Sequence, residues 1–243
     1  MKIVQIILIS LTALAGCTKK ADSSAQVTQT TVVTDTTKKT MTDTLNYLAL
    51  GDSYTIGEAV PQVQSFPYQL TNALNVDKLG VNAPTIIATT GWTTDDLISA
   101  IVRSNINGKK YDFVTLLIGV NDQFQRLSQD NYRTKFVQVL HTAINFAKGD
   151  TSRVFVLSIP DYGVTPFAGG QDSIIGPDID QFNAINKAES TKAGVHYLDI
   201  TAISRQAAND LTLVAPDGLH PSGKMYMLWV AQLEPMVKAK LKK

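Results

Sequence analysis

The sequence has few of the residues that build disulfide frameworks and metal sites. Its 243 residues include one cysteine and three histidines, and the histidines are spread over positions 141, 196 and 220. This set excludes an internal disulfide and is too small for the usual zinc site of Cys and His ligands. The sequence also has no large excess of charge of one sign, because its 22 basic residues nearly balance its 21 acidic ones. Without a net positive field we expect no binding to nucleic acid, and we expect no metal and no cofactor.

Apolar runs of membrane-spanning length are missing too. The stretch 3–15 follows Met1 and Lys2 and has the length of a signal-peptide core, whereas a bilayer-spanning helix needs about 20 apolar residues. We therefore expect residues 1–16 to be a signal peptide.

The only cysteine lies where this apolar stretch ends. The sequence Leu14-Ala15-Gly16-Cys17 resembles the lipobox of bacterial lipoproteins. The resemblance implies that Cys17 is lipidated and becomes the first mature residue, with several acyl chains and hence a stable membrane anchor. The alternative is a chance cysteine near a signal cleavage site. We expect a lipid-anchored protein of the cell envelope, on the periplasmic side or the cell surface, with the outer membrane favoured.

The next segment is rich in threonine, serine, lysine and aspartate. Residues 18–44 contain too few large apolar side chains to form a core of their own. We interpret residues 17–44 as a lipidated N-terminus followed by a flexible tether, with a short edge strand at Val32-Val33 as the alternative.

From residue 45 onward, short apolar runs alternate with amphipathic helical stripes. The runs are short and mostly apolar and show no clear alternation, as expected of parallel strands buried on both faces: 47–50, 85–88, 113–118, 154–157 and 195–200. One helix should begin near Thr93-Thr94. Five strands with helical crossovers predict one α/β domain over residues 45–243, a three-layer α/β/α sandwich around a mostly parallel sheet.

Polar residues follow the first three of these runs. Ser53 in Gly51-Asp52-Ser53 could present its hydroxyl to a substrate, or Asp52 and Ser53 could simply cap a helix. Gly91 could offer an unshielded N–H to an oxyanion, or form a plain turn. Asn121 could donate from its amide, or make an Asx turn.

Other residues expected at this sheet edge are weaker candidates for a catalytic or binding role. We assign Asp122 to turn structure, and Trp92 could be a lid or a core aromatic. A long loop from Ser158 to about Gly176 should shape a pocket. Asp161 and Tyr162 could contact substrate, but loop positions without a chemical role are favoured. His141 should lie on the surface, and His196 should be a packed or edge histidine.

The last polar block is Asp217-Gly218-Leu219-His220, followed by Pro221. The spacing lets the Asp217 carboxylate reach the Nδ1–H of His220, which leaves Nε2 free to take a proton from a serine. Pro221 suits a first helical position, so His220 should lie at a helix start. The alternative is a capping loop in which Asp217 binds backbone amides.

Together, Gly51-Asp52-Ser53, Gly91, Gly119-x-Asn121-Asp122 and Asp217-x-x-His220 resemble, in order and spacing, the GDSL or SGNH hydrolase family. The resemblance implies a flavodoxin-like sheet, Ser53 as nucleophile, His220 as base and Asp217 as its orienter. It also implies an oxyanion hole of the Ser53 N–H, Gly91 and Asn121. Tyr54 departs from the family pattern, which has leucine there. No Gly-x-Ser-x-Gly elbow is present, which disfavours an ordinary α/β-hydrolase.

This resemblance implies a serine esterase without a cofactor. Envelope anchoring favours lipid or glycan esters, and a lysophospholipase-like or carbohydrate O-acetyl esterase activity is expected. The alternative is a catalytically inactive, glycan-binding lipoprotein on the same fold. We expect a monomer that meets the membrane through the lipid at Cys17.

Overall fold

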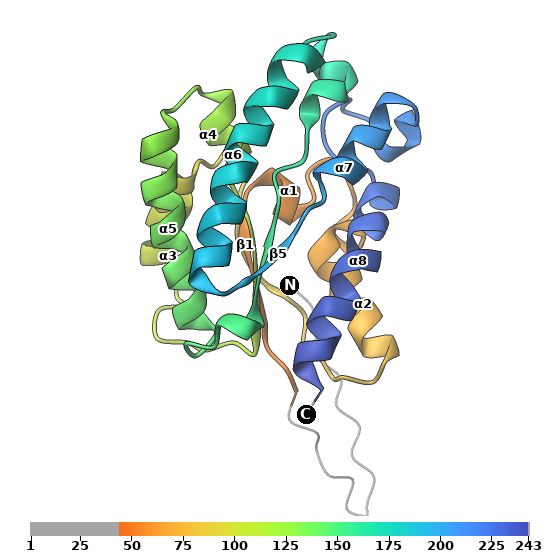
Figure 1. Ribbon diagram of the computed structural model, residues 1–243. Coiled ribbons are helices and arrows are strands. Elements are labelled where there is room, and N and C mark those ends of the chain that lie inside the picture. The colour runs from red at the N-terminus through yellow and green to blue at the C-terminus, as the bar shows by residue number, and fades with distance from the viewer. Residues whose placement is uncertain (1–43, 243) are drawn as a thin grey trace, which may run out of the picture. The chain divides into compact units, whose positions relative to one another are not determined.

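The computed structural model describes residues 44–242, which form a central sheet covered by helices on both faces (Figure 1). The expected signal peptide, the lipidation at Cys17 and nearly all of the tether therefore lie outside the described residues. Five parallel strands form the sheet in the order β2-β1-β3-β4-β5: β1 (Tyr47–Gly51), β2 (Thr85–Ala88), β3 (Phe113–Leu117), β4 (Val154–Leu157) and β5 (His196–Leu198). This is the flavodoxin-like order, so the predicted fold class is confirmed.

Burial explains why the central strands have no alternating pattern. All residues of β1, β3 and β4 are buried, since helices cover both faces of the sheet there. The edge strand β5 is shorter than the apolar run 195–200. It pairs only with β4, from Phe155 opposite His196 to Leu157 opposite Leu198.

Helices cover the two faces as the crossovers predict. On one face lie α3 (Thr94–Arg103), α5 (Gln129–Phe146) and α6 (Asp172–Ala193), and on the other lie α2 (Phe66–Val76) and α8 (Gly223–Leu241) (Figure 1). Three short helices lie in the connections from a strand to the next long helix: α1 (Ser53–Ile56), α4 (Val120–Phe124) and α7 (Thr201–Ser204). The predicted cap of α3 is a capping box, in which Thr93 and Asp96 bond each other's backbone N–H.

Two sequence-based boundaries are wrong. The loop after β4 ends at Gln171 rather than near Gly176, because α6 begins at Asp172 and contains Pro177. Pro221 is not at a helix start, since α8 begins at Gly223 behind the N-cap Ser222. Instead, Pro221 forms an isolated antiparallel bridge with Val214, and this bridge holds the preceding loop.

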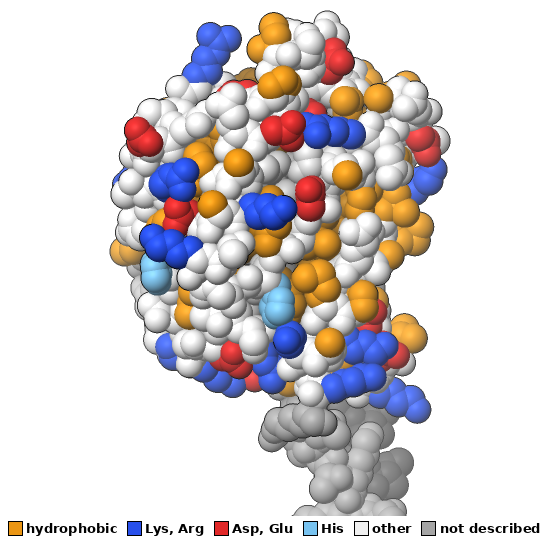
Figure 2. Space-filling view, viewed as in Figure 1, with side chains coloured by type: hydrophobic (Ala, Val, Ile, Leu, Met, Phe, Trp, Pro, Cys, Tyr) orange, Lys and Arg blue, Asp and Glu red, His pale blue; other side chains and the backbone are white. Residues whose placement is uncertain are grey.

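Charged side chains of both signs are interspersed over most of the face in Figure 2, as their near balance in the sequence suggests. Within residues 44–242, no helix combines the length and apolar character needed to cross a membrane.

Candidate active site

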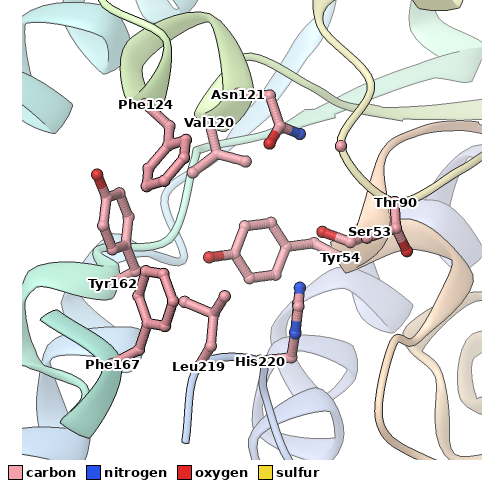
Figure 3. A pocket seen from close by; sticks show the side chains of 11 residues that line it. Ser53, Tyr54, Thr90, Val120, Asn121, Phe124, Tyr162, Phe167, Leu219 and His220 are labelled. Atoms are coloured by element: carbon pink, nitrogen blue, oxygen red, sulfur yellow. The ribbon is translucent and has the colours of Figure 1, made fainter. Parts of the chain in front are cut away.

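The predicted site residues meet at the carboxyl ends of the strands. Ser53 follows β1, Gly91 follows β2 and Asn121 follows β3, and the loop carrying His220 lies opposite them. All four line one cavity of about 170 Å³ (Figure 3). This edge, where the strand order reverses between β1 and β3, is where open parallel sheets bind ligands.

A tight turn after β1 places Ser53 in this cavity. Gly51 has no room for a side chain, because a Cβ there would lie 2.3 Å from the carbonyl oxygen of Leu117 on β3. Asp52 is the N-cap of α1 and accepts a hydrogen bond from the Tyr54 N–H at 3.0 Å. The capping interpretation therefore holds for Asp52. Ser53 is the first helical residue, and its hydroxyl makes no hydrogen bond within residues 44–242.

Asp52 is a buried carboxyl with one unpaired oxygen. Its side chain is fully buried, and Oδ2 has no partner among the described residues. Burial raises the pKa of Asp52 to about 8, with the Tyr54 N–H opposing the shift and the nearby Asp122 carboxylate adding to it. Burial likewise raises the pKa of Asp122 to about 6, against hydrogen bonds from Thr94.

We expect Asp52 to make folding pH-dependent between pH 6 and 8, a window whose lower part also includes the titration of Asp122. In the unfolded chain an aspartate has a pKa of about 3.9. The folded state therefore holds a proton that the unfolded state has released, and stability should fall as pH rises through this window. One proton contributes at most about 1.4 kcal/mol per pH unit.

Urea unfolding of the wild type and of Asp52→Asn measures this contribution. The asparagine keeps an oxygen for the Tyr54 N–H but cannot ionise, so the slope between pH 6 and 8 should flatten. Equal slopes in the two proteins would mean that Asp52 is ionised in the folded state.

Gly91 and Asn121 face the cavity from neighbouring loops. Gly91 has φ +83°, and a Cβ built there would meet nothing within 4 Å. A glycine is therefore favoured at this position by its left-handed backbone conformation and not by lack of space. The Nδ2 of Asn121 donates to the carbonyl oxygen of Trp92 at 2.9 Å. The N-cap of α4 is Gly119, no side chain caps the helix, and Asn121 Oδ1 accepts no hydrogen bond within residues 44–242, so Asn121 does not make the capping Asx turn. It links α4 to the Gly91 turn, and one N–H of its amide is left over.

The neighbours of these residues have structural contacts. Asp122 Oδ2 accepts hydrogen bonds from the N–H and hydroxyl of Thr94, which ties α4 to the start of α3. Trp92 packs against the hydrophobic core and does not line the cavity, so it is not a lid. Asp161 is buried and forms an ion pair with Arg205 at 2.9 Å.

His220 and Asp217 form a hydrogen-bonded pair. Asp217 Oδ2 lies 2.6 Å from His220 Nδ1, while its Oδ1 accepts the backbone N–H groups of Leu219 and His220, each at 3.0 Å. Asp217 therefore makes both sets of contacts that the sequence suggested, one to the imidazole and one to backbone amides. Burial alone would raise the pKa of Asp217, but these three hydrogen bonds outweigh it and hold the pKa below its usual value.

The His220 ring also has an aromatic neighbour. Tyr54 lies edge-on to the imidazole with ring centroids 5.6 Å apart, and Figure 3 shows its ring in the middle of the cavity. Among residues 44–242, no hydrogen bond joins the Ser53 hydroxyl to His220. Such bonds are often long in free enzymes and tighten with substrate.

Sequence reasoning missed most of the cavity wall. Besides the residues above, it is lined by Thr90, Val120, Phe124, Tyr162, Phe167 and Leu219. From the sequence, Tyr162 is predicted only as a member of the loop after β4, which is expected to shape a pocket and which also contains Phe167. The other two histidines lie elsewhere: His141 is exposed on α5, and His196 stacks on Phe155 at 4.9 Å.

This fold and cavity define a parallel α/β protein whose serine, imidazole–carboxylate pair and amide donors are grouped as in hydrolases of acyl compounds. Residues 49–228, which are most of the chain, match the family model of the GDSL-like lipase/acylhydrolase family. The chain belongs to that family. It is accordingly a hydrolase of carboxylic esters.

Solved structures share the fold at low sequence identity. TesA is 14% identical with a TM-score of 0.64, over 80% of this chain and 99% of TesA. Axe2, an acetylxylan esterase from Geobacillus stearothermophilus, is 17% identical with a TM-score of 0.62, over 82% and 94% of the two chains. The psychrotrophic esterase EstA from Pseudoalteromonas sp. is 16% identical with a TM-score of 0.59, over 82% and 100%. No curated protein sequence matches the chain.

Proposed function

We propose that the protein is a serine esterase in which Ser53 is the nucleophile, His220 the general base and Asp217 the residue that orients it. The observation that carries this proposal is the 2.6 Å contact between Asp217 Oδ2 and His220 Nδ1, with His220 lining the same cavity as Ser53. With Nδ1–H bound to the carboxylate, Nε2 is the nitrogen that can accept a proton.

The reaction proceeds in two displacements. Ser53 Oγ attacks the ester carbonyl carbon while its proton passes to His220 Nε2, and the alcohol then leaves with that proton. Water, deprotonated by His220, attacks the acyl-enzyme, and the acid leaves as His220 returns the proton to Ser53 Oγ. The Ser53 N–H, the Gly91 N–H and the free amide N–H of Asn121 stabilise each tetrahedral oxyanion.

The cavity favours a small acyl group. Its volume of about 170 Å³ lies below the roughly 300 Å³ from which pockets for drug-sized ligands begin. A short acyl ester, such as an O-acetyl group on a carbohydrate, fits this space better than the long chain of a lysophospholipid. The fold shared with an acetylxylan esterase is compatible with this choice.

The proposal is tested with nitrophenyl acetate, acetylated xylan and lysophosphatidylcholine, followed by mass spectrometry after fluorophosphonate treatment. We expect hydrolysis of the two acetates and labelling of Ser53 alone. Binding of the glycan without hydrolysis or labelling would favour the inactive glycan-binding alternative.

Replacing Asn121 by alanine should lower kcat by about 10²–10³, because losing one oxyanion donor typically has that effect. KM should change little, since the amide bonds the tetrahedral oxyanion more strongly than the ground-state carbonyl. The same change removes the hydrogen bond to the Trp92 carbonyl, which should cost about 1 kcal/mol of stability. Kinetics and thermal melts separate the two effects: a lower Tm with near-normal kcat would leave Asn121 as a link between loops only.

We also propose that Cys17 carries a lipid that anchors the enzyme in the cell envelope. Replacing Cys17 by serine should move the protein from the membrane fraction to the soluble fraction without changing the rate on soluble esters, since the catalytic residues lie between Ser53 and His220. Metabolic labelling with a palmitate analogue gives a direct readout, and an unlabelled wild-type protein would refute the anchor.

A further inference from the structure

A second cavity adjoins the catalytic one and is larger. Its volume is about 310 Å³ against about 170 Å³ for the catalytic cavity, and the two share Phe124, Tyr162 and Phe167 in their walls. Beyond these residues, the second cavity has a mixed wall: it is lined by the apolar side chains of Ala168, Ile174 and Ile175 and by the polar side chains of Gln123, Arg126, Gln171 and Asp178. None of the catalytic residues proposed above lines it.

The three shared side chains form a cluster of aromatic rings. The ring centroids of Phe124 and Tyr162 are 6.1 Å apart, those of Phe124 and Phe167 are 6.3 Å apart, and those of Tyr162 and Phe167 are 6.5 Å apart. Figure 3 shows the rings grouped at the end of the catalytic cavity away from Ser53. We call Phe124, Tyr162 and Phe167 the aromatic partition.

Hydrogen bonds fix the partition in relation to the catalytic residues. The buried Tyr162 donates its hydroxyl to Gln123 Oε1 at 3.0 Å, and Gln123 donates to Asp178 at 2.8 Å. The Phe167 N–H donates to the carbonyl oxygen of Gly218 at 2.9 Å, inside the loop that carries Asp217 and His220. The rings of Phe124 and Phe167, by contrast, are 54% and 52% exposed, so they can be truncated without opening the protein core.

The two ends of the catalytic cavity differ in chemistry. Near Ser53 it is bounded by the exposed Thr90 and Gly91, and the Thr90 hydroxyl contacts the Glu58 carboxylate. Toward the partition its wall is formed by Val120 and Leu219 together with the aromatic rings. A hydroxyl-rich alcohol suits the first end, and the hydrocarbon part of an acyl group suits the second.

We propose that Phe124 and Phe167 determine acyl-chain length: they close the acyl end of the catalytic cavity, restrict the enzyme to short acyl groups, and separate these from the second cavity, whose Ile174 and Ile175 side chains would contact a longer chain. This rests on the proposed serine-esterase function and names its specificity-determining residues. Tyr162 is the fixed ring against which both phenylalanines pack.

The test is kcat/KM for nitrophenyl acetate, butyrate, hexanoate and octanoate, a series that varies the acyl chain and keeps the alcohol constant. The wild type should prefer acetate or butyrate and lose activity steeply beyond them. Phe124→Ala and Phe167→Ala should each raise the octanoate-to-acetate ratio by on the order of tenfold or more, since one methylene in an apolar pocket changes discrimination by about 10–200-fold.

A second substitution shows where the longer chain goes. Ile174→Trp, added to Phe167→Ala, places bulk in the second cavity and should reverse most of the gain on octanoate. Leu211→Ala removes an equally exposed apolar side chain that lines neither cavity and should leave the ratio unchanged. Thermal melts, with Phe124→Leu and Phe167→Leu as milder variants, identify any loss that is due to unfolding.

Several results would overturn the proposal. These are unchanged ratios in stable Phe124 and Phe167 variants, a gain that persists in the double variant, or wild-type activity that is as high on octanoate as on acetate. A shift seen only when the alcohol of acetate esters is lengthened would assign the partition to the alcohol instead. In each case hydrolysis of nitrophenyl acetate would leave the esterase function standing, whereas no hydrolysis of any ester by the wild type would overturn both.

Discussion

Ser53→Ala should abolish ester hydrolysis, with kcat lower by on the order of 10⁴–10⁶. Without the hydroxyl no acyl-enzyme can form, and only the weak effect of binding the ester beside oxyanion donors remains. Steady-state hydrolysis of nitrophenyl acetate measures the loss, and a fluorophosphonate probe should no longer label the protein.

The Ser53 variant should keep its fold. The Ser53 hydroxyl makes no hydrogen bond within residues 44–242, and the turn is held by Asp52 and by the contact of Gly51 with β3. The Tm should therefore stay within about 2 °C of the wild type, as for a change of a few tenths of a kcal/mol.

His220→Ala is the matched comparison, because nucleophile and base act as a unit. It should lose nearly as much kcat as Ser53→Ala, and the double variant should lose little more than either single variant. Losses that multiply in the double variant would show that the two residues act independently, and an active Ser53→Ala protein would end the nucleophile assignment.

The central strands could be predicted from sequence because a strand that is buried on both faces consists mostly of apolar residues. Residues 47–50 and 113–118 are almost entirely apolar for this reason, and the structure forms β1 and β3 from these stretches, next to each other inside the sheet. The start of α6 could not be predicted in this way. Gly176 and Pro177 suggest a loop. In the structure, however, a Cβ on Gly176 would lie 3.0 Å from Asp161 Oδ2, so a glycine is needed there because two segments distant in the sequence pack closely together.

The same limit applies to the candidate site. The order of the polar blocks after successive strands indicates that Ser53, Gly91, Asn121 and His220 converge, since parallel strands all end at one edge of a sheet. The bond from Asn121 to the Trp92 carbonyl joins residues 29 positions apart, and the aromatic partition draws on α4 and on the loop after β4. No local sequence pattern predicts either feature, because both depend on how loops that are distant in the sequence pack in the folded protein.

Asp217→Asn should lower kcat by on the order of 10³–10⁴ while leaving the loop intact. The asparagine oxygen can keep the two backbone hydrogen bonds that Asp217 Oδ1 accepts from Leu219 and His220. Its NH₂ group then faces His220 Nδ1 and can only donate, so Nδ1 becomes the acceptor and the ring proton moves to Nε2. In that tautomer Nε2 cannot take the proton of Ser53.

The opposite amide orientation would restore the correct tautomer, but it would point the NH₂ group at two backbone N–H donors. Those two lost hydrogen bonds cost about 1 kcal/mol each, more than the single bond regained at the ring, so the inactive arrangement should prevail. Asp217→Ala separates the two roles of the side chain, since it loses the backbone bonds as well and should lower the Tm in addition to kcat. Comparing kcat and Tm for both variants checks this account: near-normal kcat in a stable Asp217→Asn protein would leave Asp217 as a loop cap and require another residue to orient His220.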